Sequence, residues 1–319
     1  MKPIGLIFNP LAHINRNRAE PQLDALKGVL GERARVVSTK SKDEIPFALE
    51  ELNKEIRILA ISGGDGTISS VLSSYVNLFG DRDIPIIVPL KGGTINMIAD
   101  DAGLLDDQIT TCRKLIHYME SEDELPTIER GLIRVSDNRF NYCNYAFTWI
   151  DGFLYKFIKW YRREGANAGI ALKLILKSGI MSLTNPRGDL FKEVESRLYL
   201  DDKKLPYDSH LFLAAGTVKR LVFGFRIFTE EVEEGEQFNI FYMRLPFFRK
   251  AVLQLPRFLY LGVRSDVSGN FVNRSTRSAK IEGNRGYVID GEVYDSDEAS
   301  DIRLEPGPKL KLLSFNHKK

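Results

Sequence analysis

The sequence predicts two domains of different classes, an N-terminal parallel α/β domain and a C-terminal antiparallel β domain with inserted helices. The chain has 319 residues, which is too long for one ordinary hydrophobic core. Up to about residue 125, continuous apolar strands alternate with helical patterns, and hairpin-like segments dominate afterwards. We therefore expect domains at 1–125 and 126–319, with a C-terminal segment that can pack back on the first domain.

The first domain carries the pattern of a parallel sheet covered on both faces. Uninterrupted apolar stretches such as "IGLIF" and "IPIIVPL" are typical of strands buried on both sides, and periodic apolar residues between them indicate helices. In chain order, strands are expected at 4–8, 34–38, 56–62 and 84–90, and helices through 23–30, 47–52 and 67–78. Such sheets bind ligands at the carboxyl ends of their strands, where two glycine-rich turns fall here.

The second domain is expected to consist of hairpins and short strands. "GLIRVSDNRFNYCNYAF" is typical of a hairpin that turns at Asp137-Asn138, and "ESRLYLDDKKLPY" of one that turns at Asp201-Asp202. Further strands are expected in "HLFLAAG", "FRIFTEE", "QFNIFYM", "YVIDGEVYD" and "DIRLEP". Helical patterns interrupt these strands at roughly 151–182 and 246–262.

The amino-acid composition excludes several classes of protein. Hydrophobic residues make up 43% and charged residues 28%, as in an ordinary globular protein, and the net charge of +2 argues against a nucleic-acid partner. The two cysteines, Cys112 and Cys143, together with an N-terminus unlike a signal peptide, favour the reducing cytoplasm. The four histidines are scattered without metal-ligand spacing. No uninterrupted apolar stretch is long enough to span a bilayer, since "GIALKLILKSGIMSL" is broken by Lys173 and Lys177.

The stretch "GGDGT" at 63–67 combines two features that conflict unless a cation is present. Glycines between a strand and a helix let backbone N–H groups approach phosphate, whereas the Asp65 carboxylate would repel phosphate. Magnesium bound with the phosphate resolves the conflict. A plain turn or N-cap role for Asp65 is the structural alternative.

Several motifs together resemble the diacylglycerol kinase catalytic family, which includes sphingosine kinases and bacterial lipid kinases. They are "NP" at 9–10, "GGDGT" at 63–67, "PLKGGTIN" at 89–96, "DGE" at 290–292 and the closing "PGPKLKLL". The resemblance implies a Rossmann-like nucleotide domain, a β-sandwich-like second domain, ATP and Mg²⁺ as cofactors, and phosphate transfer to a lipid hydroxyl in phospholipid metabolism. NAD kinases and phosphofructokinases share Gly-Gly-Asp-Gly, so a small-molecule kinase of NAD-kinase type is the alternative enzyme.

The resemblance also assigns residues to the nucleotide site. Asp65 would act in catalysis and hold magnesium through water, and Ser38 or Thr39 would lie at the end of the second strand beside the nucleotide. The full nucleotide-binding set that the resemblance implies is Asn9, Thr39, Gly63, Gly64, Asp65, Gly66, Thr67, Gly93, Thr94 and Asn96.

Asp290 and Glu292 are the second pair of candidate catalytic residues. On one strand, residues two apart share a face, so both carboxylates would point into the same space beside Gly291. Neighbouring carboxylates raise each other's proton affinity, which suits a base that accepts a hydroxyl proton. By the resemblance Asp290 would be that base and Glu292 its support. The structural alternative is an exposed hairpin end.

Two departures from the family motifs bear on activity. "NPLAH" replaces the usual Ser-Gly after "NP", and "GGTINMIAD" has Met97 where the family usually has an acid. These changes favour a third hypothesis, a catalytically silent protein that binds nucleotide or lipid.

Aromatic and basic residues are mixed in 152–165 and 244–262, which suits peripheral contact of one of the two segments with a membrane surface. The structural alternative is that the apolar faces of these helices pack on the β domain. We expect a cytoplasmic protein that acts on a lipid at the membrane surface. The acceptor lipid and the oligomeric state, including a homodimer, stay open at this point.

Overall fold

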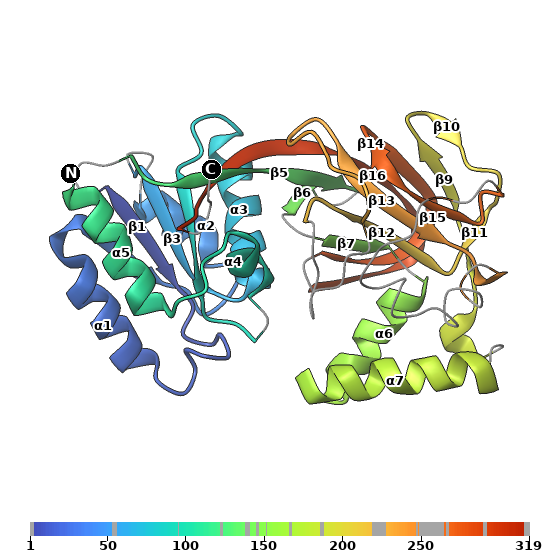
Figure 1. Ribbon diagram of the computed structural model, residues 1–319, viewed down its shortest axis with the longest axis horizontal. Coiled ribbons are helices and arrows are strands. Elements are labelled where there is room, and N and C mark those ends of the chain that lie inside the picture. The colour runs from blue at the N-terminus through green and yellow to red at the C-terminus, as the bar shows by residue number, and fades with distance from the viewer. Residues whose placement is uncertain are drawn as a thin grey trace. The chain divides into compact units, whose positions relative to one another are not determined.

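The computed structural model describes residues 3–315 except for 53–55, 95, 122–123, 138–140, 145–146, 151, 166–167, 186–187, 219–227, 247, 249–264, 266–267 and 290–291. The chain divides into two compact units (Figure 1). Unit 1 comprises Met1–Arg130 and Pro308–Lys319, and unit 2 comprises Gly131–Gly307. The chain leaves unit 1 inside strand β5 (Thr127–Ser136) and returns inside strand β16 (Glu292–Leu313).

Unit 1 is built on a parallel sheet, as predicted. Its strands are β1 (Ile4–Phe8), β2 (Ala34–Ser38), β3 (Ile58–Gly63) and β4 (Ile86–Lys91), in the order β2-β1-β3-β4. Every residue of β1 and β3 is buried, which explains their continuous apolar sequences. Next to β4 the C-terminal part of β16 adds another parallel strand, with Leu312 opposite Ile87.

Helices cover this sheet on both faces (Figure 1). Their bounds are α1 (Ala19–Leu30), α2 (Ile45–Leu52), α3 (Asp65–Phe79), α4 (Met97–Asp101) and α5 (Gln108–Glu120), with a 3₁₀ turn at Gly31–Arg33. α1 packs beside α5 and α2 packs beside α3. Neither α4 nor α5 was predicted from the sequence. Asp107 is the N-cap residue of α5, and its side chain accepts a hydrogen bond from the Thr110 amide at 2.9 Å.

Unit 2 is built from antiparallel strands, again as predicted. Its longest path runs β14-β13-β12-β7-β15-β16, β9 and β10 continue from β15, and β5 pairs with β16 and β6. The remaining bounds are β6 (Asn141–Asn144), β7 (Phe147–Ile150), β8 (Val194–Glu195), β9 (Arg197–Leu200), β10 (Lys203–Lys204), β11 (Ser209–His210), β12 (Phe212–Gly216), β13 (Phe238–Met243), β14 (Phe271–Thr276) and β15 (Ala279–Ile289). Inward-facing residues such as Leu213, Ile240 and Tyr287 form the buried core.

Both predicted hairpins are present. Leu200 pairs with Lys203, and the intervening Asp201 and Asp202 both have positive φ, which this tight turn requires. β5 and β6 pair through Ser136 and Asn141, although Asn138 lies outside the described residues.

The predicted helix at 151–182 is two helices, α6 (Gly152–Arg163) and α7 (Ala168–Thr184), and a 3₁₀ turn follows at Asp189–Phe191. Gly165 has a φ of 103°, a conformation that ends helices. Most of the predicted helix at 246–262 lies outside the described residues. Of the predicted strand "FRIFTEE" at 225–231, the last four residues are described and form no strand, so that prediction was wrong over this part.

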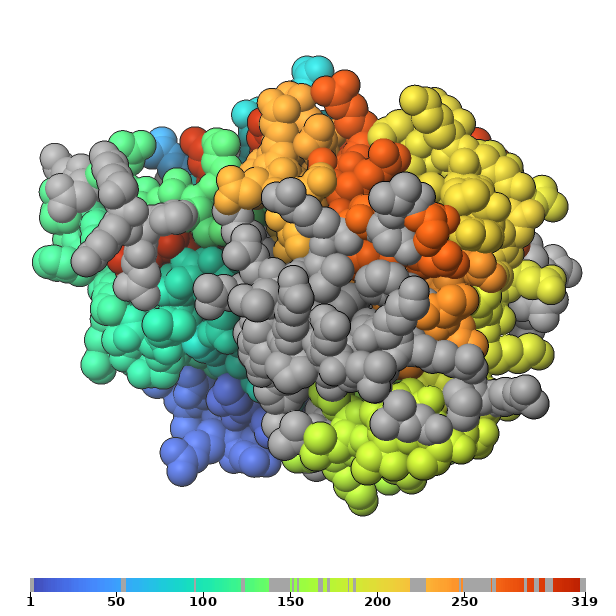
Figure 2. Space-filling view, turned by 45° about the vertical axis from the view of Figure 1, so that its right-hand side comes forward, coloured from blue at the N-terminus to red at the C-terminus, as the bar shows by residue number. Residues whose placement is uncertain are grey.

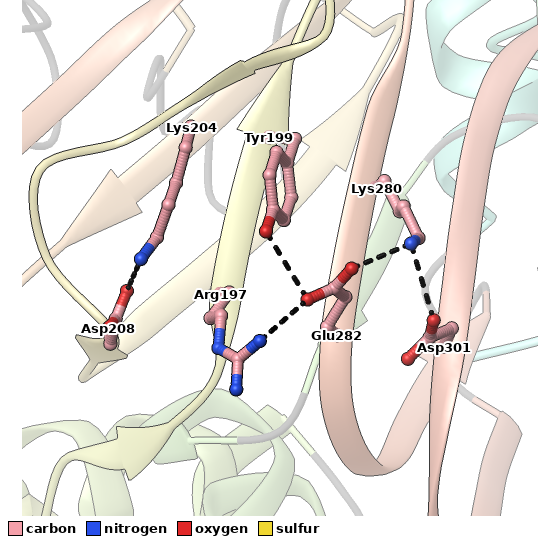
Figure 3. A network of polar contacts seen from close by, with 7 residues as sticks. All are labelled: Arg197, Tyr199, Lys204, Asp208, Lys280, Glu282 and Asp301. Carbon is pink, nitrogen blue, oxygen red and sulfur yellow. Dashed lines mark hydrogen bonds and ion pairs between the residues drawn. The ribbon is translucent and has the colours of Figure 1, made fainter.

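A polar network spans β9, β15 and β16 on the surface of unit 2 (Figure 3). Glu282 accepts hydrogen bonds from Lys280 at 2.7 Å and from Tyr199 at 3.3 Å, and Lys280 also lies 3.5 Å from Asp301. These charges neutralise one another at partly exposed positions, where ion pairs contribute little to stability. We therefore assign this network to the surface of the sheet and not to a functional site.

Candidate functional site

The two glycine-rich turns of unit 1 lie side by side at the carboxyl edge of the parallel sheet. β3 ends at Gly63 and β4 ends at Lys91, and the two residues are paired. A Cβ added to Gly93 would lie 2.5 Å from the Cα of Gly64, so only glycine fits there without a shift of backbone. The sequence placed both turns at strand ends, and the sheet register brings them into contact.

Asn9 and Thr67 connect the end of β1 to the start of α3. The Asn9 side-chain amide donates to Thr67 Oγ1 at 2.9 Å, while Asn9 Oδ1 accepts from the Leu11 amide. The Thr67 side chain lies so close to Gly63 that an added Cβ would come within 2.6 Å of Thr67 Cβ. Both side chains therefore hold the first glycine turn beside the end of β1.

Asp65 joins the two turns through its carboxylate. Oδ2 accepts from the Met97 amide at 3.0 Å and Oδ1 accepts from the Ile98 amide at 2.9 Å, so Asp65 caps α4 although it belongs to α3. Burial raises the pKa of this carboxyl above its ordinary value and the Asp100 charge adds to the rise, although the two amide hydrogen bonds oppose it. No ion pair of Asp65 is present in the described part of the chain.

Asn96 closes the second turn on itself. Its φ of 55° is the left-handed conformation that asparagine tolerates. Its Oδ1 accepts from the Gly93 amide at 2.8 Å, and its Nδ2 donates to the Gly93 carbonyl at 2.9 Å. The predicted contact of Asn96 with a ligand therefore competes with a reciprocal pair that fixes the turn.

The other predicted nucleotide residues lie on the same edge with different exposure. Thr39 follows β2, is buried, and its amide donates to the Phe8 carbonyl at 2.9 Å. Thr94 is exposed in the second turn. Gly66 is the second residue of α3, where amide groups have no partner inside the helix.

A buried polar network under the turns was not predicted. Gln108 donates to Asn15 Oδ1 at 2.8 Å and to the Lys91 carbonyl at 3.0 Å, and Ser62 Oγ donates to Gln108 Oε1 at 2.6 Å. Asn15 in turn donates to the Asn9 carbonyl at 2.8 Å. The network ties the loop after β1 to the ends of β3 and β4. No sequence signal marks it, because its members are polar residues far apart in the chain.

Lys91 places a cation at this edge. Its Nζ lies 2.6 Å from Asp100 Oδ1 and 3.4 Å from the Leu105 carbonyl. Asp100 is about half exposed, with a side-chain accessibility of 51%. An anionic ligand at this edge would therefore meet Lys91 beside an exposed, exchangeable partner.

Of the second candidate pair, Asp290 lies outside the described residues. β15 ends at Ile289 and β16 begins at Glu292, and these two residues pair as antiparallel neighbours. The expectation of one strand through "YVIDGEVYD" was therefore wrong, because Ile289 and Glu292 belong to two antiparallel strands that pair with each other. The inference that Asp290 and Glu292 share a strand face loses its basis.

The geometry supports binding of an anion with a cation. Amide groups at the first turn of α3 and a glycine-lined surface suit phosphate oxygens. Burial disfavours the charged form of the Asp65 carboxyl, and a nearby cation would stabilise that form. Asp65 could therefore hold a magnesium ion through water. Among the described residues no cluster of three or more His, Cys, Asp or Glu could hold a metal by itself. A cation here would need oxygen ligands from the phosphate and water.

No helix in the described residues is both long and apolar enough to cross a bilayer. Of the two aromatic and basic segments, α6 corresponds to the first, and most of the second lies outside the described residues.

Comparison with known proteins confirms the resemblance that the motifs suggested. Residues 3–125 match the sequence profile of the diacylglycerol kinase catalytic domain. A structure provisionally described as a diacylglycerol kinase from Bacillus anthracis strain Sterne superposes with a TM-score of 0.64 at 16% identity, over 99% of this chain and 98% of that chain. A structure described as a diacylglycerol kinase from the same strain gives a TM-score of 0.59 at 16% identity, over 99% and 97%. At this identity the structures establish the fold alone. No curated protein is significantly similar to this chain in sequence.

Proposed function

We propose, from the match of residues 3–125 to the diacylglycerol kinase catalytic domain, that this protein is an ATP- and magnesium-dependent kinase that phosphorylates a lipid hydroxyl. The observation that carries the proposal is the joining of the two glycine turns by Asp65 at the carboxyl edge of a parallel sheet. A domain of a kinase family and a sheet edge suited to phosphate point to the same reaction class.

The residues of unit 1 bind and orient the nucleotide. The amides of Gly64 and Gly66 at the start of α3 would bind the phosphates, and Gly93 and Thr94 would form the opposing wall. Asn9, Thr67 and Asn96 act by holding the turns in place. Mg²⁺-ATP, when bound, supplies the transferred phosphoryl group and the cation that screens its charge.

Asp65 has two tasks in this proposal. Its two oxygens accept hydrogen bonds from the amides of α4, and their remaining lone pairs would be available to hold a hydrated magnesium ion. Asp290 accepts the proton of the lipid hydroxyl, with Glu292 as its support. The assignment of these two residues rests on the family resemblance alone.

The test is transfer of labelled γ-phosphate from ATP into a total lipid extract in the presence of magnesium. Wild type is expected to label a lipid, and the mobility of that lipid identifies the acceptor. Asp65→Asn and Asp290→Asn should each lose roughly 100-fold or more in rate. Asp83→Asn is the matched control, because Asp83 is exposed and its φ of 57° suits asparagine equally well.

Full activity of Asp290→Asn would remove Asp290 from the role of base. Labelling of NAD in place of lipid would replace the proposal with a soluble-acceptor kinase.

One observation favours a second candidate, a nucleotide-binding protein without activity. Met97 stands at the first position of α4, directly against the Asp65 carboxylate, where the family resemblance leads us to expect an acid. This candidate predicts that ATP raises the melting temperature without phosphate transfer. Met97→Asp would then be expected to bring activity to a silent wild-type protein.

A further inference from the structure

The outward face of α7 is an unusual surface for a water-exposed helix. Leu176 and Ile180 are 61% and 64% exposed, respectively, although both are large apolar residues. The positions i, i+4, i+7 and i+11 from Gly169 fall on one side of the helix. Together with neighbouring positions they line a shallow depression formed by Gly169, Lys173, Leu176, Lys177, Ile180 and Met181. Figure 2 shows α6 and α7 (lime green) at the lower edge of the molecular surface.

Two serines lie among the buried residues of α7 that the structure describes. Leu174, Ser178 and Ser182 are buried, so two of these three inward positions are serines. Ser178 Oγ is buried without a hydrogen-bond partner in the described residues, and Ser182 Oγ donates to the Gly179 carbonyl within its own helix. Burying hydroxyls while exposing leucine and isoleucine is unfavourable for a helix that faces water. The pattern suits a helix whose outward face meets an apolar phase.

The positive charge of α6 and α7 indicates that the apolar phase is a membrane with anionic lipid. Lys173 and Lys177 flank Leu176 on the exposed face, and neither α6 nor α7 contains an acidic residue. Lys177 also lies 5.0 Å from the centre of the Trp160 ring on α6. Basic side chains beside exposed apolar ones, with a tryptophan next to them, match the interface of an anionic bilayer.

We infer that the outward face of α7 docks the protein on a membrane surface that contains anionic lipid. Leu176 and Ile180 insert among the acyl chains, and Lys173 and Lys177 contact the headgroups. This inference adds a membrane partner to the proposed lipid-kinase function and rests on that function. The sequence had predicted membrane contact for one of the two segments 152–165 and 244–262; the exposed apolar face lies on α7.

The experiment measures binding to vesicles of phosphatidylcholine mixed with phosphatidylglycerol, without ATP, by sedimentation and by tryptophan emission, to which Trp149 and Trp160 both contribute. Wild type should bind, its tryptophan emission should shift to shorter wavelength, and binding should weaken in pure phosphatidylcholine. The Leu176→Ser, Ile180→Ser double variant should bind at least about tenfold more weakly. Lys173→Gln and Lys177→Gln should each cost roughly fivefold on the anionic vesicles only.

Phe47→Ser is the matched control, because Phe47 on α2 is 72% exposed and lies in the other unit. Equal loss of binding by Phe47→Ser, or full binding by the double variant, would overturn the inference. A dimer in solution that the double variant dissolves, with no vesicle binding by wild type, would assign the face to a second copy of this chain. Vesicle binding without phosphate transfer would leave this inference standing and remove the proposed function.

Discussion

His210 makes the stability of unit 2 depend on pH. Its ring is buried, Nδ1 lies 2.7 Å from Ser196 Oγ, and Nε2 lies 3.3 Å from the Ile150 carbonyl. Because a carbonyl can only accept, Nε2 carries the proton and Nδ1 accepts from the serine hydroxyl. The structure therefore holds a neutral imidazole.

Burial lowers the pKa of His210 from 6.5 to about 4, and the Lys156 charge assists, while the Ile150 carbonyl and the Glu193 charge oppose the shift. Between these two values the unfolded chain binds a proton that the folded chain does not. The free energy of unfolding therefore rises with pH across this window, by about 1.4 kcal/mol per unit. The stability is complete above pH 6.5, and about 3 kcal/mol of it is lost by pH 4.

The perturbation is His210→Gln, which removes the titration and keeps a donor and an acceptor. The assay is urea unfolding followed by tryptophan fluorescence between pH 4 and pH 7.5. Both tryptophans, Trp149 and Trp160, belong to unit 2, so their signal reports the unit that contains His210. Other groups titrate in both proteins, so the difference between wild type and variant isolates His210.

We expect the stability advantage of wild type over His210→Gln to shrink by about 3 kcal/mol as pH falls from 6.5 to 4. A difference that stays constant over this range would refute the reasoning. It would mean that the imidazole is protonated or solvated in the folded protein.

Two further predictions concern unit 1. In urea unfolding, Gly93→Ala should destabilise the protein by about 1–3 kcal/mol, because the new Cβ would meet the Gly64 backbone, and it should also weaken ATP binding. Gly28→Ala is the comparison, because nothing lies near its Cβ inside α1. It should stabilise the protein by about 0.5–1 kcal/mol. Equal effects of the two alanines would contradict the contact between the turns. Gln108→Leu should lower the free energy of unfolding by about 3 kcal/mol, because Asn15 Oδ1 and the Lys91 carbonyl lose a buried donor. A melting temperature equal to that of wild type would show that the network does not stabilise the protein.

Much of unit 1 follows from local sequence. "IGLIF" predicts β1 with its observed bounds, because strands buried on both faces must be continuously apolar. "ARVVS" likewise has the bounds of β2, although β2 is an edge strand in which only Ala34 is buried. The hairpin at Asp201-Asp202 was equally predictable, since tight turns need residues that tolerate positive φ. These features depend on neighbours in the chain and are therefore visible without the fold.

The break at 290–291 shows where local reading fails. A period of two does not distinguish one strand from two strands that meet at a two-residue turn. "YVIDGEVYD" satisfies both interpretations, and only the pairing of Ile289 with Glu292 decides between them.

The sequence by itself determined strands β1 and β2, the glycine turns, the presence of Asp65 between them and the match of residues 3–125 to the diacylglycerol kinase catalytic domain. Only the tertiary structure decided that Asp65 caps α4, that Gly64 touches Gly93, and that α7 exposes Leu176 instead of its serines. The physical reason is that a hydrogen bond or a buried face depends on which segments the sheet register and helix packing bring together. Such contacts join residues that are distant in the chain, and no local period encodes them.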